Sequence, residues 1–188
     1  MKQEIERRQP KGLLDYLSLA VTTFGVGYMP LAPGTWGSIV AVAIYVGVSW
    51  LVATMALVFK ANISGFGWEP FLSWVHAGVL IAFLLFTLLG VWAADRSTGL
   101  FGDLDPSQAV VDEVIGQLIV FLFVPFGIGW TFILAGFLLF RLFDIWKPYP
   151  IDSLQVLPGG IGVCADDILA GVYAGICLSV IYAISLSL

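Results

Sequence analysis

Long apolar runs alternate with short polar clusters along this chain, and the runs predict helices that cross a lipid bilayer. Residues 37–59, 71–94 and 168–188 are almost entirely apolar. About 20 residues at a rise of about 1.5 Å each cross a hydrocarbon core, so each run is long enough. The apolar segment 13–24 is too short to cross and is predicted to be a short helix that lies in the interface or enters it partway.

One further apolar stretch, residues 114–140, is interrupted by Pro125, Gly127 and Gly129, which disfavour a straight helix. A single crossing would divide the acidic clusters of the chain between the two sides of the membrane. A helical hairpin that turns at 125–129 would return the chain to its starting side, and such backbone is tolerated where protein buries it. We therefore predict a re-entrant or hairpin segment at 114–140.

The distribution of lysine and arginine supports the hairpin. With it, seven of the eight basic residues lie on one side of the membrane and one, Lys60, lies on the other. The seven are Lys2, Arg7, Arg8, Lys11, Arg96, Arg141 and Lys147. Because positive residues concentrate in cytoplasmic loops, we place the N-terminus and the polar clusters in the cytoplasm.

Composition narrows the fold class further. The chain is 60% hydrophobic and 11% charged, with a mean hydropathy of +0.99, which excludes an ordinary soluble domain. We predict an all-α, polytopic integral membrane helical bundle. Its 188 residues contain no hydrophilic linker, so we expect a single domain, 1–188, with residues 1–12 as a flexible cytoplasmic tail. A net charge of -5 argues against nucleic acid as a partner.

Five carboxylates stand at the ends of apolar runs, where proximity to hydrocarbon is unfavourable unless they face a cation or water. They are Asp112, Glu113, Asp144, Asp166 and Asp167. Mg2+ binds through oxygen ligands, and two or three carboxylates with a substrate phosphate complete its shell. The alternative is that each acidic pair occupies the first turn of a helix, where the macrodipole favours negative charge.

Cationic side chains flank one of these carboxylates. Arg141 and Asp144 are three residues apart on one helical face, and Pro148 ends the helix at Lys147. Arginine offers a fork and lysine a point charge for phosphate oxygens, so we expect both to bind phosphate. A purely structural pair between Arg141 and Asp144 is the alternative.

Glycine-rich segments precede two of the predicted spans. Thr35 and Ser38 lie at the start of the first span, where free N–H groups favour an anion such as phosphate. An ordinary capped turn is the alternative. Residues 159–162, Gly-Gly-Ile-Gly, are predicted to form a loop that lets backbone approach a ligand.

Four motifs in this order resemble the phosphatidylglycerophosphatase A family, Mg2+-dependent integral membrane phosphatases of bacterial phosphatidylglycerol synthesis. The motifs are Pro33-Gly-Thr-Trp-Gly-Ser38, Asp112-Glu-Val-Ile-Gly116, Phe140-Arg-Leu-Phe-Asp-Ile-Trp-Lys-Pro-Tyr-Pro150, and Gly159-Gly-Ile-Gly162 followed by Asp166-Asp-Ile-Leu-Ala-Gly171. The resemblance implies removal of the terminal phosphate from phosphatidylglycerophosphate at the cytoplasmic face of the bacterial inner membrane.

The resemblance leads to a hypothesis for the site. The metal ligands are expected to be Asp112, Glu113, Asp166 and Asp167, and the catalytic residues Asp144, Asp166 and Asp167. Asp144 is either a further ligand or the base that activates water. The phosphate is expected to bind Thr35, Ser38, Arg141 and Lys147. An aspartyl-phosphate intermediate is the competing route.

Two other function classes are compatible with carboxylates in an apolar chain. One is a carboxylate-lined membrane cation carrier, and the other is a noncatalytic membrane subunit. A carrier would usually need ionisable residues at membrane depth, whereas here, apart from His76, they stop at the apolar boundaries. The sequence therefore favours the phosphatase.

Overall fold

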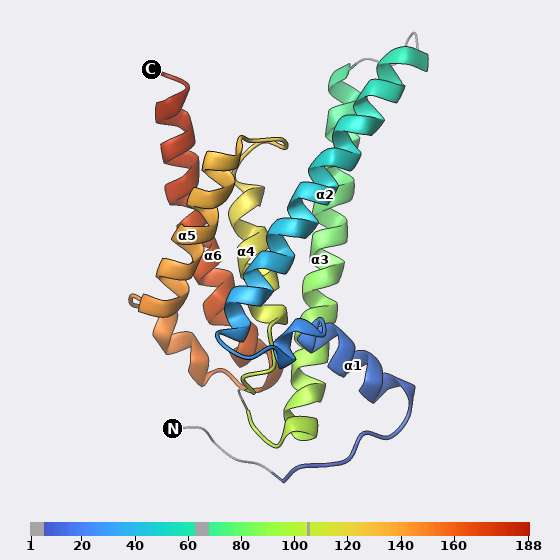
Figure 1. Ribbon diagram of the computed structural model, residues 1–188, viewed down its shortest axis with the longest axis vertical. Helices are drawn as coiled ribbons and strands as arrows, with labels where there is room; N and C mark the ends of the chain where they lie inside the picture. Colours follow the sequence, from blue (N-terminus) through green and yellow to red (C-terminus); the bar gives the residue numbers. More distant parts are fainter. Residues whose placement is uncertain (1–5, 63–67, 105) are drawn as a thin grey trace.

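The structure, a computed structural model, describes residues 6–62, 68–104 and 106–188 and consists of helices joined by loops in that part of the chain (Figure 1). The elements are α1 (Leu13–Thr23), η1 (Val26–Tyr28), α2 (Pro33–Asn62), α3 (Trp68–Phe101), α4 (Val111–Leu122), α5 (Trp130–Trp146), η2 (Ile151–Val156) and α6 (Gly159–Ser185). The predicted all-α membrane bundle is confirmed.

Three helices are long and apolar enough to cross a membrane: α2 over Pro33–Val58, α3 over Glu69–Phe101 and α6 over Gly159–Ser185. These are the three predicted spans; α2 and α3 extend beyond their apolar runs at both ends, whereas α6 begins earlier than its run and ends at Ser185, three residues before the run does. The apolar run marks the part of a helix that suits hydrocarbon, whereas the helix itself continues into polar sequence. The three spans are therefore confirmed, with boundaries that are wider than predicted except at the C-terminal end of α6.

The start of α6 corrects one prediction. Residues 159–162, predicted to be a loop, form the first turn of α6, so Asp166 and Asp167 lie in its third turn and not its first. Pro158 at the N-cap supplies no side-chain hydrogen bond. Instead, Asp95 of α3 accepts a hydrogen bond from the Gly160 N–H at 3.1 Å. A partner distant in sequence thus stabilises the early start of this helix.

The predicted hairpin is confirmed. Helices α4 and α5 run antiparallel on either side of a turn that contains Pro125 and Gly127, the latter at φ 77° (Figure 1). With 12 residues, α4 reaches about 18 Å, less than the roughly 30 Å of a hydrocarbon core. The Tyr45 hydroxyl of α2 donates a hydrogen bond to the Pro125 carbonyl at 3.2 Å. This bond satisfies turn backbone that has no helical partner.

Glycines bring α4 into backbone contact with α6. A Cβ atom on Gly116 would lie 2.5 Å from the Asp167 carbonyl oxygen, and one on Gly171 would lie 2.3 Å from the Gly116 carbonyl oxygen. Only glycine permits such an approach, as at small-residue crossings of membrane helices. The crossing fixes the second turn of α4, just after Asp112 and Glu113, beside the third turn of α6.

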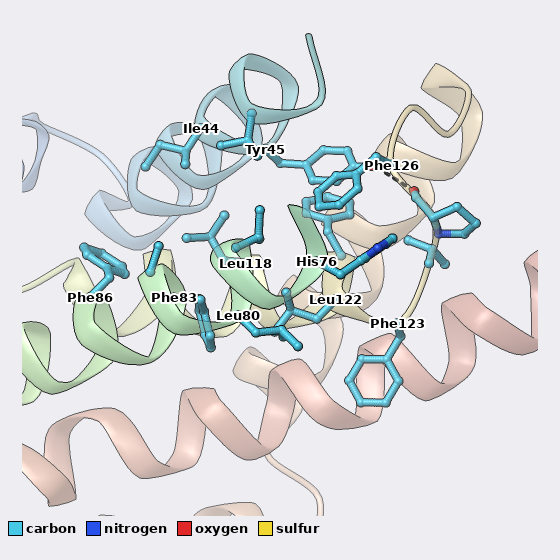
Figure 2. A pocket seen from close by; sticks show the side chains of 16 residues that line it. Ile44, Tyr45, His76, Leu80, Phe83, Phe86, Leu118, Leu122, Phe123 and Phe126 are labelled. Atoms are coloured by element: carbon cyan, nitrogen blue, oxygen red, sulfur yellow. Dashed lines mark hydrogen bonds between the residues drawn. The ribbon is translucent and has the colours of Figure 1, made fainter. Parts of the chain in front are cut away.

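An apolar groove separates α2 from α3 and has α4 as its floor (Figure 2). Its volume is about 560 Å³. The labelled side chains include Ile44, Leu80, Phe83, Leu118 and Leu122, which extend into it from three different helices (Figure 2). No acidic side chain lines it among the described residues, so the groove is distinct from the acidic part of the molecule.

The N-terminal segment joins α1 and α3 through a group of charges that we call the arginine cluster: Arg8, Asp15 and Arg96. Asp15 is fully buried and accepts hydrogen bonds from Arg8 Nη1 at 2.8 Å, Arg8 Nη2 at 2.9 Å and Arg96 Nε at 2.8 Å. The hydrogen bonds from Arg8, foremost, hold the pKa of Asp15 well below its usual range. The tail 1–12 was predicted to be flexible, and its residues 1–5 lie outside the described residues. Within the described part of the tail, the Arg8 N–H donates a hydrogen bond to the Gly99 carbonyl at 2.8 Å.

Candidate active site

A cavity of about 720 Å³, the acidic cavity, opens where α4 and α6 begin and α5 ends. These three helix ends lie together at the end of the molecule away from the C-terminus (Figure 1). The predicted site residues that line it are Asp112, Glu113, Asp144, Lys147, Asp166 and Asp167. The structure thus brings together all five predicted carboxylates, which are separated by up to 55 positions in the sequence.

Three of these carboxylates form a compact group. Asp112, Glu113 and Asp167 each offer a carboxylate oxygen, and these oxygens lie within 4.8 Å of one another. Burial, followed by the charge of Asp112, raises the pKa of Glu113 well above its usual value. Within the described chain, Glu113 Oε2 is buried and has no hydrogen-bond partner. Such crowding of oxygen donors fits a small divalent cation, which would neutralise the shared charge.

Asp166 is placed differently from the expected fourth ligand. Its Oδ2 accepts hydrogen bonds from Lys147 Nζ at 2.5 Å and from Gln155 Nε2 at 2.9 Å. Burial alone would lower the pKa of Lys147, but the hydrogen bond and charge of Asp166 outweigh it and raise that pKa. Asp166 therefore holds the lysine beside the carboxylate group.

The end of α5 supplies the other ion pair. Arg141 Nη1 lies 2.6 Å from Asp144 Oδ2. This is the ion pair that the sequence offered as the alternative to phosphate binding. Asp144 also lies beside Asp167 in the cavity lining, so it links Arg141 to the compact group. As predicted, α5 ends before Pro148, and Lys147 adopts a left-handed conformation with φ 46°. That turn carries the lysine back toward α6.

The start of α2 reaches the site through its glycines. A Cβ atom on Gly34 would lie 2.2 Å from Glu113 Oε1 and 3.1 Å from Arg141 Nη1. One on Gly37 would lie 2.9 Å from the Val110 carbonyl oxygen. The backbone of the first turn of α2 therefore packs directly against the acidic and basic side chains.

The two hydroxyls of that turn do not line the acidic cavity. Ser38 is fully buried, and its Oγ donates a hydrogen bond to the Gly34 carbonyl at 3.1 Å. The Thr35 N–H donates to the Ala32 carbonyl at 2.9 Å. The structure thus places the predicted phosphate-binding hydroxyls of Thr35 and Ser38 outside the cavity lining, together with Arg141.

Three residues around the site were not predicted from the sequence. Gln155 of η2 binds Asp166, and Asp95 of α3 holds the start of α6. Gln117 of α4 is fully buried and follows Glu113 by one helical turn. Only Gln117 carries a sequence signal, because it interrupts an apolar run, whereas the other two act through contacts that no local pattern specifies.

The fold and the site define a polytopic helical membrane protein with an acidic, cation-accepting cavity at one end of its bundle. The chain belongs to the phosphatidylglycerophosphatase A family, which matches residues 19–182. The resemblance seen in the four motifs is therefore confirmed, and the protein is a phosphatase enzyme.

Several curated proteins are similar over most of their length. A phosphatidylglycerophosphatase A of Haemophilus influenzae is 36% identical over 177 residues, which cover 92% of this chain and 90% of that protein. A phosphatidylglycerophosphatase A of Escherichia coli is 32% identical over 155 residues, which cover 82% of this chain and 76% of that protein. A protein of Bacteroides thetaiotaomicron named putative phosphatidylinositol-3-phosphatase is 38% identical over 160 residues, which cover 85% of this chain and 89% of that protein. No solved structure matches the chain.

Proposed function

We propose that the protein hydrolyses the terminal phosphate of phosphatidylglycerophosphate to give phosphatidylglycerol, with Mg2+ as cofactor, at the cytoplasmic face of the bacterial inner membrane. The observation that supports this best is the grouping of Asp112, Glu113 and Asp167 within 4.8 Å, beside Lys147 in one cavity. Two relatives that are 32–36% identical carry the name of this activity.

In this proposal Asp112, Glu113 and Asp167 hold the cation. Their oxygens are the donor type that Mg2+ prefers, and the buried Glu113 Oε2, which has no hydrogen-bond partner among the described residues, supports a ligand role for this oxygen. When bound, the cation supplies positive charge that polarises the phosphoryl group and stabilises its developing negative charge. Asp166, first expected to be a ligand, instead positions Lys147.

The cationic side chains would bind the phosphate. Lys147 lines the cavity and is held by Asp166 at 2.5 Å, while Arg141 is held by Asp144 at 2.6 Å. Fixed positive charges that face a phosphate stabilise the charge that develops during transfer. Arg141 would need to turn from its position behind Asp144 to share in this role.

Asp144 is the proposed base. Its carboxylate takes a proton from water as the water oxygen forms a bond to phosphorus, and the bond from phosphorus to the glycerol oxygen breaks. The leaving alkoxide takes up the proton that Asp144 received, which gives phosphatidylglycerol and inorganic phosphate and returns Asp144 to its carboxylate form. The ion pair with Arg141 would keep Asp144 oriented during this step.

Phosphate release by the purified protein tests the activity and its cofactor together. We expect release from phosphatidylglycerophosphate with Mg2+ and loss of release after chelation by EDTA, restored by added Mg2+. Release that persists in EDTA would refute the cation site. Absence of release under every condition would favour a noncatalytic subunit.

A second substrate is supported by one specific observation. The Bacteroides relative, 38% identical over 160 residues, is named for an inositol phospholipid. We therefore propose phosphatidylinositol phosphate as the runner-up substrate. The ratio of kcat/KM for the two lipids, measured in the same mixed micelles, decides between them, and we expect the ratio to favour phosphatidylglycerophosphate.

Membrane orientation can be measured by cysteine labelling. Val156 lines the acidic cavity and is 84% exposed, whereas Leu186 follows the end of α6 and is 71% exposed. In a Cys177→Ser background, we expect an impermeant maleimide to label Leu186→Cys in intact spheroplasts. Val156→Cys should be labelled only after lysis, and the reverse pattern would refute a cytoplasmic site.

A further inference from the structure

Gln117 is a polar side chain in the most deeply buried helix of the bundle. From Val114 to Leu122, α4 is otherwise made of apolar residues and glycine. The side chain is fully buried, and neither its Oε1 nor its Nε2 has a hydrogen-bond partner in the part of the chain that the structure describes. Burying an amide without partners is unfavourable, so a residue kept in this state needs an explanation.

The position of Gln117 on α4 places it one helical turn from the carboxylates. Gln117 follows Glu113 by four residues, and residues i and i+4 share a helical face. Side chains of a helix also lean toward its N-terminus, which here is the end that carries Glu113. One turn in the other direction lie Val120 and Phe121, both buried in the apolar core. The nearest polar group along this face is therefore Glu113.

Glu113 presents a matching acceptor. Its Oε2 is buried and, among the described residues, also has no hydrogen-bond partner. Gly116, next to Gln117, packs so closely on α6 that a Cβ atom would lie 2.5 Å from the Asp167 carbonyl oxygen. This contact holds the helix that carries Gln117 and Glu113 in place beside the third carboxylate of the group.

We propose that Gln117 is a positioning residue: when a divalent cation binds, its amide turns to donate a hydrogen bond to Glu113 Oε2 and holds that carboxylate toward the cation, a bond that is not formed in the structure. This role rests on the function proposed above, because it requires the cation site. Ligating carboxylates are commonly held by such outer hydrogen bonds, and loss of one typically weakens metal affinity by about 10- to 100-fold. Gln117 does not contact substrate in this proposal.

The test compares Gln117→Met with the matched control Ile119→Met. Methionine has a volume similar to that of glutamine and removes the amide, and Ile119 is a buried apolar position on the other side of α4. The readout is the affinity for Mn2+, measured by electron paramagnetic resonance in detergent, together with the thermal midpoint of the cation-free protein. We expect Gln117→Met to weaken Mn2+ binding about 10- to 100-fold. Ile119→Met should bind Mn2+ as the wild type does.

The thermal midpoint separates positioning from packing. Because an unsatisfied amide is removed, we expect the cation-free Gln117→Met protein to melt no lower than the wild type. A packing role predicts the opposite pattern, a lower midpoint with unchanged Mn2+ affinity, and that result would overturn the proposal. If the methionine variant does not fold, Gln117→Asn replaces it. This variant keeps the amide but shortens its reach, so affinity equal to the wild type would likewise overturn the role.

Failure of this role and failure of the proposed function give different results. Mn2+ affinity of Gln117→Met within twofold of a wild type that hydrolyses lipid would reject the role of Gln117 alone. A wild type that neither binds Mn2+ nor releases phosphate from lipid would reject both.

Discussion

Two charged clusters in the same bundle have opposite balances of charge. In the arginine cluster, one buried carboxylate, Asp15, receives hydrogen bonds from the two guanidinium groups of Arg8 and Arg96. In the acidic cavity, six carboxylates, the five predicted ones and Asp103, share the lining with one basic residue, Lys147, and Arg141 lies beside Asp144. A buried charge that is fully paired holds structure, whereas like charges gathered in a cavity favour binding of an external cation.

The surroundings of the two clusters follow the same division. The arginine cluster links the N-terminal segment to α3 and lies outside both described cavities. The carboxylates of the other cluster line a cavity of about 720 Å³, large enough to admit a phosphate and its glycerol. Charge balance and access to a cavity together indicate which cluster performs chemistry.

The largest effect is expected at Asp167. The change Asp167→Asn removes one of the three grouped carboxylates and should lower turnover by about 10³-fold or more, since a bound cation contributes several kcal/mol to catalysis. Phosphate release from phosphatidylglycerophosphate measures this loss. The variant should still purify as a folded protein, because the substitution relieves repulsion between like charges. Turnover close to that of the wild type would remove Asp167 from the site.

Lys147 should have the next largest effect. Replacing it with methionine removes the positive charge that we propose binds the phosphate and leaves Asp166 with Gln155 alone, so kcat/KM should fall about 10²-fold. The control Lys147→Arg keeps the positive charge and should retain more activity than the methionine variant. Equal loss in both variants would show that the position matters for shape and not for charge.

Sequence patterns predicted the hairpin and the five carboxylates because both depend on local properties. Pro125 and Gly127 disrupt a helix wherever they occur, and charge at the end of an apolar run is visible without any structure. The partner of Asp166 could not be predicted in this way. Its pairing with Lys147 depends on the left-handed turn after α5 and on the crossing of α4 with α6.

The start of α6 is a second feature that the sequence alone could not predict. The sequence Gly-Gly-Ile-Gly is typical of a loop, but it forms the start of α6, where Asp95 accepts a hydrogen bond from the Gly160 N–H and the helix begins two turns before Asp166. Likewise, Gly34 belongs to a glycine-rich segment of the sequence, but its close contact with Glu113 follows only from the packing of α2 on α4. Contacts between distant elements decide these details, and no single segment encodes them.

Disrupting the arginine cluster should affect stability without affecting chemistry. The change Asp15→Asn leaves Arg8 and Arg96 without their shared carboxylate, so we expect the thermal midpoint in detergent to fall by about 5 °C. The kcat/KM of the folded fraction should stay within about twofold of the wild type, because Asp15 lies outside the acidic cavity. A loss of turnover as large as that of Asp167→Asn, at an unchanged midpoint, would contradict the division between the two clusters.

The smallest expected effect is a difference in pH dependence between the clusters. The pKa of Glu113 is raised in the folded protein by burial and by Asp112, so above its unfolded value of about 4.3 the folded state binds more protons than the unfolded state. Stability of the cation-free protein should therefore fall as pH rises from about 5 to 8. The pKa of Asp15 is lowered, so its contribution is fully present above about pH 4 and constant over this range.

Thermal midpoints of the cation-free protein measured from about pH 5 to 8 test this difference. We expect the midpoint of the wild type to decrease by a few degrees, on the order of 2–5 °C, and that of Glu113→Gln to decrease less, because the glutamine carries no titrating proton. Saturating Mg2+ should also flatten the wild-type profile, since the cation replaces the proton on Glu113. An equally steep profile in Glu113→Gln would show that the slope arises elsewhere, and Glu113 would then no longer distinguish the acidic cavity from the arginine cluster.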